Sequence, residues 1–161
     1  MTFDGGGVPR GRFSDVWVSR TRWIGVSWAE VDMLDVSFLD GALAGVQAYG
    51  GRFRRVVFER CKIDTLNLRD ADLRDVEFRD CELSEADFGA ATLTGVTFPG
   101  STVRRARFGN ATLQKVDFRG ARELDIAAGC DSLRGAIVDT AQLAELAPAL
   151  ADTLGIVVKD R

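Results

Sequence analysis

The feature that most constrains this chain is an apolar residue at every fifth position. Stepping by five from Phe13 to Phe118 meets an apolar residue each time, and most of these residues are large. From Val16 on, the residue two positions earlier is small or β-branched, except at Leu66. Residues two apart on an extended chain point to the same side. Each unit of five therefore predicts a short extended segment with two inward side chains and then a corner, which fits neither a helix nor a simple alternating strand.

A second period of twenty residues is superposed on the first. Val and Phe, two positions apart, return every twenty residues, while the residue between them changes freely. Four units of five then make one turn of a four-sided coil, as expected for a solenoid. The variable residue faces water, and the recurring pair lines the core behind one wall. This core ladder consists of Val36, Phe38, Val56, Phe58, Val76, Phe78, Val96, Phe98, Val116 and Phe118.

Several units match the loose consensus A-(D/N)-L-x-x. The best matches are Ala71-Asp72-Leu73, Ala86-Asp87-Phe88 and Leu66-Asn67-Leu68, whereas many other units carry Thr, Glu, Ser or Arg at the middle position. On these residues the chain resembles the pentapeptide-repeat family over about residues 11–138, with a distant likeness to its quinolone-resistance members. The resemblance implies an all-β solenoid, a right-handed quadrilateral β-helix. About six coils spaced by ~4.8 Å would form a rod ~30 Å long.

We expect three parts in the chain. Residues 1–12 would form an N-terminal leader or cap, and residues 13–138 the β-helix. Residues 139–161 would form a C-terminal helix with a short tail.

The last coil should be irregular at residues 119–132. In register, Glu123 would point inward, and a carboxylate cannot be buried without a partner. Leu124 or Ile126 would fill the interior instead. Cys130 lies in the same segment, where it can reach the surface, and we assign it no role.

The C-terminal segment has the signals of a helix. Asp139 and Gln142 form a variant of the capping box, and Gly155 is a natural C-terminal cap. Pro148 should kink the helix or split it in two. The helix is expected to cover the last coil, or to form a dimer interface, because the resemblance implies dimers through this end; monomer and homodimer both stay open. The residues for either role are Leu143, Leu146, Leu150 and Leu154.

The composition excludes much catalytic chemistry. The chain has no histidine, which removes the commonest general base and the commonest metal ligand. Cys61 and Cys81 lie twenty residues apart, but two thiols without further ligands make a poor zinc site, so we interpret them as core residues. No acid/base couple stands out, and a filled rod offers no cleft. We therefore predict a protein that is not an enzyme and needs no metal or cofactor.

Charge and hydropathy favour a cytoplasmic protein. The net charge is −3, the first ten residues contain no apolar run typical of a signal peptide, and no stretch approaches a membrane span. The three cysteines suit a reducing compartment. We expect no contact with membranes.

The expected outer surface combines charge ladders with a small apolar patch. Residues twenty apart become neighbours, and their charges alternate in sign along Arg12, Asp32, Arg52 and Asp72, and along Arg20, Asp40, Arg60 and Asp80. Three apolar residues fall at outward positions and are either covered by residues 1–12 or free to bind a partner. The candidate partner surface is Trp17, Leu34, Leu39, Arg52, Arg54 and Arg55.

Two functions follow as hypotheses. The first is a non-enzymatic interaction or scaffold protein whose protein partner is unknown. The alternative, implied by the resemblance, is a DNA-mimicking modulator of a topoisomerase, DNA gyrase, that protects it from quinolone-type inhibitors. Interleaved arginines and a short rod count against mimicry. We expect no direct nucleic-acid binding, because no face interleaves aromatic and basic residues.

Overall fold

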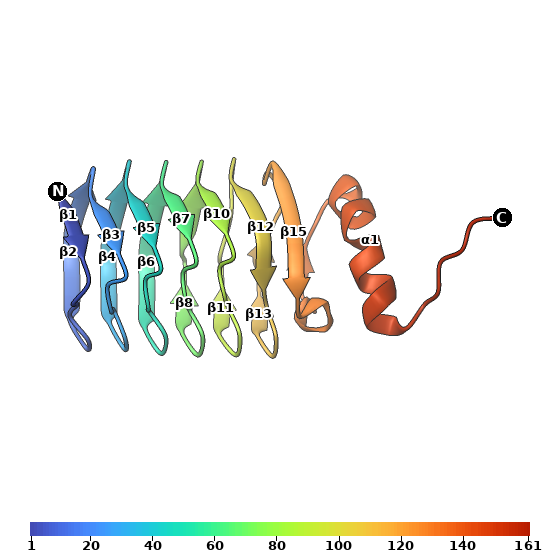
Figure 1. Cartoon of the computed structure of the whole chain (residues 1–161), viewed down its shortest axis with the longest axis horizontal. Helices are drawn as coiled ribbons and strands as arrows, with labels where there is room; N and C mark the ends of the chain where they lie inside the picture. Colours follow the sequence, from blue (N-terminus) through green and yellow to red (C-terminus); the bar gives the residue numbers. More distant parts are fainter.

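The chain folds into a parallel β-solenoid closed at one end by a helix (Figure 1). The computed structural model describes residues 1–161. The predicted quadrilateral β-helix with a C-terminal helix is confirmed. The rod has about 7 turns instead of the six expected. The additional coil lies at the N-terminal end.

Four walls run along the rod, and the first is a seven-stranded sheet in the order β1-β3-β5-β7-β10-β12-β15. Its strands are β1 (Thr2–Asp4), β3 (Arg22–Ile24), β5 (Ala42–Ala44), β7 (Lys62–Asp64), β10 (Glu82–Ser84), β12 (Thr102–Arg107) and β15 (Glu123–Ala128). The second wall has no extended strands along most of its length, and single bridges in register join its coils from Gly7 to Arg107.

A second sheet, in the order β13-β11-β8-β6-β4-β2, forms the third wall and much of the fourth. Its long strands β2 (Arg12–Ser19), β4 (Asp32–Leu39) and β6 (Arg52–Glu59) pass through the corner between these walls. The third wall continues with β8 (Asp72–Arg74), β11 (Thr92–Thr94) and β13 (Thr112–Gln114). The fourth wall continues with β9 (Glu77–Arg79), β14 (Val116–Asp117) and β16 (Ala136–Ile137). The inward residues of this fourth wall recur every twenty positions from Val18 to Phe118.

The corners explain why the period is five. From Gly5 to Gly120, every fifth residue has a positive φ, including non-glycine residues such as Asp35 and Arg60. A single left-handed residue turns the chain after each short extended segment, and glycine and aspartate tolerate this conformation best. Parallel partners are therefore offset by twenty residues, as in Phe38 and Phe58.

The core is filled by stacked side chains. Behind the fourth wall, Phe38, Phe58, Phe78, Phe98 and Phe118 form a column with ring centroids 5.0 to 5.2 Å apart and nearly parallel planes. The valines two positions before them are also buried, so all ten residues of the core ladder lie inside the rod.

Residues 1–12, expected as a leader or cap, instead belong to the first coil. β1 pairs with β3, and Phe3 stacks on Trp23 with ring centroids 4.2 Å apart. Phe3 and Val8 continue the five-residue register upstream of Phe13, which is the physical reason for the extra coil.

The last coil is irregular, and its cause is a bulge. Leu124 pairs with Val103 and Ile126 with Ala106, so β15 shifts its register by one residue between them. Both side chains are buried, whereas one of them was expected to fill the interior. Cys130 begins the short 3-10 helix η1 (Cys130–Ser132) and is buried, although the sequence alone allows it to reach the surface.

Helix α1 (Thr140–Leu154) covers the last coil and is not split at Pro148. The capping box is present, with the Asp139 carboxylate accepting from the Gln142 N–H at 2.8 Å and the Gln142 side chain accepting from the Asp139 N–H at 3.0 Å. The Gln142 amide also donates to the carbonyl of Phe118 at 2.7 Å, which ties the helix to the core column.

The four leucines of α1 do not share one face. Leu146 is buried and Leu150 packs against the core, whereas Leu143 and Leu154 are exposed. The helix therefore covers the rod with one side and leaves apolar residues on the other, followed by the exposed tail residues Ile156 to Val158.

Candidate interaction surface

The outer face of the fourth wall carries the most exposed aromatic side chain of the rod. Trp17, at the middle position of its Val-x-Val unit, is 80% exposed. It is in register with Ser37 and Val57 on the next two strands, and Leu39 lies on the same wall. With Ser19, these residues form an uncharged, partly apolar patch, which we call the Trp17 patch: Trp17, Ser19, Ser37, Leu39 and Val57.

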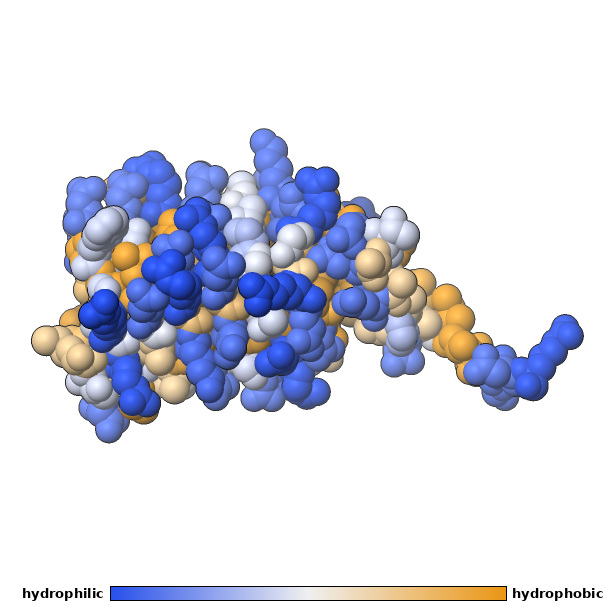
Figure 2. Space-filling model, turned by 90° about the horizontal axis from the view of Figure 1, so that it is seen from above, coloured by the Kyte–Doolittle hydropathy of each residue, from blue (hydrophilic) through white to orange (hydrophobic).

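The sequence leaves two positions open for Trp17, covered by residues 1–12 or exposed, and the structure shows the second. Residues 1–12 form part of the first coil and leave Trp17 exposed. The surface seen in Figure 2 is mainly hydrophilic, with hydrophobic atoms around the N-terminal coils and along the C-terminal tail. A solvated tryptophan beside partly buried apolar residues is typical of a binding surface, because tryptophan is enriched among residues that dominate interface energies.

Leu34, predicted to share this patch, lies around the corner on the third wall. It lines an open hollow of ≈ 230 Å³ between the first coils. The other lining residues are Arg12, Phe13, Ser14, Asp32 and Arg54. The hollow offers two guanidinium groups, one carboxylate and the Ser14 hydroxyl, which donates to Asp15 at 3.4 Å, so it can bind ions.

The three predicted arginines are not a free basic group. Arg55 holds Asp35 on the preceding coil with two hydrogen bonds of 2.7 and 2.9 Å, and Arg54 approaches Asp32 at 3.4 Å. Arg52 has no ion pair: Asp32, with which it is in register, is approached instead by Arg54 at 3.4 Å and by Arg12 at 3.9 Å. The alternating ladder is therefore only partly formed in this column.

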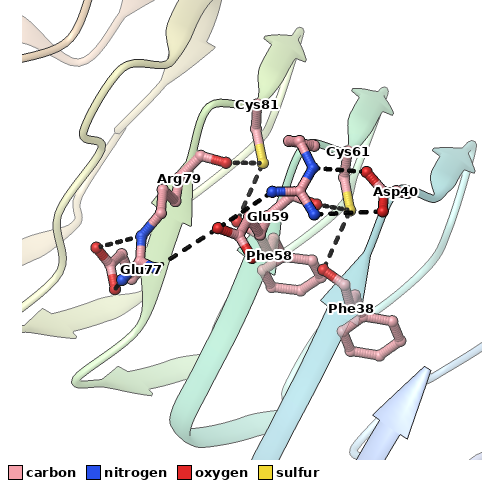
Figure 3. A network of polar contacts seen from close by, with 9 residues as sticks. Phe38, Asp40, Phe58, Glu59, Cys61, Glu77, Arg79 and Cys81 are labelled. Carbon is pink, nitrogen blue, oxygen red and sulfur yellow. Dashed lines mark hydrogen bonds and ion pairs between the residues drawn. The ribbon is translucent and has the colours of Figure 1, made fainter. Parts of the chain in front are cut away.

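Ion pairs between coils also line the corner beside the fourth wall (Figure 3). Arg60 contacts Asp40 at 2.7 Å and Glu59 at 3.4 Å, and Arg79 contacts Glu77 at 2.8 Å and Glu59 at 3.6 Å. The hydrogen bond from Arg60 holds the pKa of Asp40 below its usual range. The pairs of Arg60 with Asp40 and of Arg79 with Glu59 join neighbouring coils and support their register, whereas the other two pairs lie within one coil.

Cys61 and Cys81 lie just inside the same corner. Each thiol donates to a carbonyl of the preceding coil, Cys61 to Phe38 at 3.4 Å and Cys81 to Phe58 at 3.1 Å. The hydrogen bond with Cys61 and burial raise the pKa of Cys81, which keeps it a protonated, unreactive thiol. No group of three or more His, Cys, Asp or Glu side chains is placed to hold a metal ion.

A polar hollow of ≈ 290 Å³ on the second wall is the other candidate for chemistry. Its side chains satisfy one another, since Asn67 donates to Gln47 at 2.8 Å and Arg69 approaches Asp87 at 3.3 Å.

One surface property was not predicted from the sequence. Residues 61–88 contain nine acidic and four basic residues, so this middle band is strongly acidic although the chain is nearly neutral. Several of the acids have no ion pair: Asp64, Asp70, Asp75, Asp80 and Glu82. A count of charged residues in this segment would have revealed the acidic band, but the charge ladders of the first three coils, whose signs alternate, suggest a neutral surface.

Helix α1 falls short of the length and hydropathy needed to cross a bilayer, and it is the one α-helix of the chain.

Comparison with known proteins gives one family match and several similar structures. The family model described as a pentapeptide repeat region matches residues 31–108. A pentapeptide repeat protein from the thylakoid lumen of Arabidopsis thaliana has a similar structure, with a TM-score of 0.52 and 23% identity over 62% of this chain and 69% of that one. QnrB1, a plasmid-mediated fluoroquinolone resistance protein, aligns over 99% of both chains with 13% identity and a TM-score of 0.47. No curated protein matches the sequence.

Proposed function

We propose that this chain, which carries a pentapeptide repeat region over residues 31–108, is a non-enzymatic interaction or scaffold protein of the cytoplasm. The observation that carries this proposal is the exposed Trp17 within the uncharged Trp17 patch. Burying a tryptophan and its apolar neighbours against a partner removes a large area from water, and such residues dominate binding energies. The remaining walls are mostly polar and charged.

The test is quantitative affinity capture from the native cytosol with three baits. The wild type should retain one or more proteins that Trp17→Ser loses by about tenfold, which corresponds to about 1.4 kcal/mol. Tyr49→Ser is the matched control, because Tyr49 is also an exposed aromatic but lies on the second wall. Equal capture by all three baits would contradict a role for the Trp17 patch, and turnover of a substrate by the purified chain would contradict the non-enzymatic proposal.

The second candidate function is modulation of a topoisomerase such as DNA gyrase through mimicry of DNA. The acidic band of residues 61–88 favours it, because a topoisomerase surface that binds phosphates would attract such a band. We rank it second because the band circles the rod, whereas the phosphates of a duplex follow its length. Direct binding of nucleic acid to this band is disfavoured by like charge.

A supercoiling assay with purified gyrase, with and without a quinolone, tests this candidate. Inhibition or protection at submicromolar protein should disappear in a variant that combines Asp70→Asn, Asp75→Asn and Asp80→Asn, which neutralises three unpaired corners. No effect of the wild-type chain at high concentration would remove the candidate.

The exposed side of α1 provides a second surface for assembly. Leu143 and Leu154 are 51% and 73% exposed, and the apolar tail follows them. A homodimer through this end is therefore part of the proposal, as the alternative to a monomer. Leu143→Asp combined with Leu154→Asp should abolish any such dimer.

A further inference from the structure

The outward residues of the fourth wall form two columns, one on each side of the buried phenylalanine column. Reading from the first coil to the last, one column is Trp17, Ser37, Val57, Glu77, Thr97, Asp117 and Ile137. The other column is Ser19, Leu39, Glu59, Arg79, Pro99, Arg119 and Asp139. In four of the seven coils the two columns complement each other in size or charge: Trp17 stands beside Ser19, Ser37 beside Leu39, Glu77 beside Arg79 and Asp117 beside Arg119. The other three coils place Val57 beside Glu59, Thr97 beside Pro99 and Ile137 beside Asp139.

We propose that the fourth wall binds the fourth wall of a second copy, with the two rods parallel. The proposal deepens the proposed function, because it rests on the Trp17 patch being an interaction surface and names its partner. A two-fold axis parallel to the rods places one column of each chain against the other column of its partner. Each residue therefore faces the partner residue that belongs to the other column of the same coil.

The size pattern of the first two coils fits this arrangement. Trp17 would face the partner's Ser19, and Leu39 would face the partner's Ser37. A protruding tryptophan then meets a serine, and the second contact reverses the order of large and small. Complementary shape of this kind lets apolar side chains pack and exclude water at an interface.

The charges of the later coils fit as well. Glu77 and Arg79 pair within the chain at 2.8 Å, and Asp117 and Arg119 pair at 2.9 Å. Under the parallel arrangement each acid also faces an arginine of the partner. An antiparallel pair that overlaps all coils would instead place Glu77 against the partner's Glu77 and Arg79 against the partner's Arg79, which is repulsive.

Two unpaired corner charges in the first coil select the same arrangement. Asp15 and Arg20 flank the wall at opposite corners, both have positive φ, and neither forms an ion pair within the chain. The two-fold axis brings Asp15 opposite the partner's Arg20, and Arg20 opposite the partner's Asp15. At the next two coils the corner residues pair with one another, Asp35 with Arg55 and Asp40 with Arg60, so these corners present little net charge to a partner. At the fourth coil Asp75 and Asp80 have no ion pair, and each would face the other's counterpart in the partner, which opposes the association and helps to keep it weak.

The wall sets the strength of the association. Seven coils at ~4.8 Å give a length of ~34 Å, and three extended residues give a width of ~10 Å. This area is well below the ~800 Å² per partner of a standard stable interface, so the dimer should be weak and depend on concentration.

Sedimentation velocity from about 10 μM to 1 mM tests the proposal, a range that covers weak, reversible association. The wild type should shift from monomer to dimer, and Trp17→Ser should weaken the association by about tenfold. Glu77→Arg alone and Arg79→Glu alone should each weaken it, because like charges then face each other. The double variant with both changes should restore the association. An equimolar mixture of the two single variants should restore it as well, and this result would also show that the single variants are folded.

Cross-linking fixes the orientation. Chains with Ser37→Cys mixed with chains carrying Leu39→Cys should join through a short bis-maleimide, because these positions face each other in the parallel arrangement. Chains with Ser37→Cys mixed with Arg119→Cys should not, since these sites lie four coils apart. The native cysteines are buried and do not compete.

Three results would overturn the proposal: no self-association at 1 mM, self-association unaffected by the charge variants, or loss of the dimer in the Leu143→Asp and Leu154→Asp variant instead. If self-association is absent while Trp17→Ser still loses a captured protein, the occupant of the wall is a different protein. In that case the proposed function stands and this inference falls.

Discussion

Removal of one ring from the stacked phenylalanine column should be strongly destabilising. Phe78 is fully buried between Phe58 and Phe98, with ring centroids 5.1 and 5.2 Å away, and it meets the edge of Phe88 at 6.4 Å. Phe→Ala in a packed core costs ~3–5 kcal/mol. The upper part of this range applies here, because aromatic pairs add ~0.5–1.5 kcal/mol beyond burial and Phe78→Ala loses three of them.

The expected loss for Phe78→Ala is therefore about 4–5 kcal/mol, or about 10–20 °C in Tm for a chain of this size. Thermal and urea unfolding followed by circular dichroism measure both quantities. The matched control is Glu77→Ala, since its side chain is on the outer face of the same strand, and its Tm should stay within about 2 °C of the wild type. A Phe78→Ala variant as stable as this control would refute the stacked-column account.

Three further predictions concern the corners, the ion pairs and the lid. Gly100→Ala should lower stability by about 1–3 kcal/mol, because the φ of Gly100 is 67° and a Cβ would collide with the Asp80 carboxylate. Urea unfolding measures this loss. Recovery of stability in the double variant with Asp80→Ala would identify the collision as its cause. Arg55 and Arg60 hold the pKa values of Asp35 and Asp40 below their usual range, so this stabilisation is complete above pH ~4 and is lost as the pH falls through the lowered folded-state pKa values. A Tm series between pH 7 and pH 2 should show that loss, and the combined Arg55→Gln and Arg60→Gln variant should show a smaller one. Gln142→Ala should free α1, because it removes half of the capping box and the bond to Phe118; hydrogen exchange in residues 140–154 should then accelerate at least tenfold while β6 stays protected, and unchanged exchange would contradict the lid.

The regular part of the fold follows from the sequence because one rule repeats. Each inward pair must be apolar and each corner must accept a positive φ, so the list from Phe13 to Phe118 predicts both the walls and the core ladder. Phe3 and Val8 obey the same rule. The sequence does not decide the first coil, because Gly5 to Gly7 fit a flexible leader as well as the positive φ of a coil corner.

The irregular parts could not be predicted because several local solutions satisfy the same residues. Leu124 and Ile126 are both apolar, and the bulge that buries both depends on β12 beside them. Pro148 is incompatible with one intrahelical hydrogen bond, yet α1 continues because Leu146 and Leu150 hold it against the rod on either side. The position of Cys130 follows from that packing and not from its own sequence neighbours.

The candidate surface was predictable in part. An outward position for Trp17 follows from the register, but its exposure depends on the path of the first twelve residues. Leu34 and Leu39 both belong to β4. The corner at Asp35, which has a positive φ, places them on two different walls. Whether Arg52 or Arg54 pairs with Asp32 depends on the side-chain conformations, which the sequence pattern alone does not give.

Hydroxyl-radical footprinting of Trp17 tests the central claim most directly, that this protein acts through its fourth wall. Tyr49, exposed on the second wall, serves as the internal reference in the same molecule. With its captured partner, or at concentrations where it self-associates, the chain should show strong protection of Trp17 and unchanged oxidation of Tyr49. Oxidation of Trp17 at the free rate in the complex, with protection elsewhere, would contradict the account.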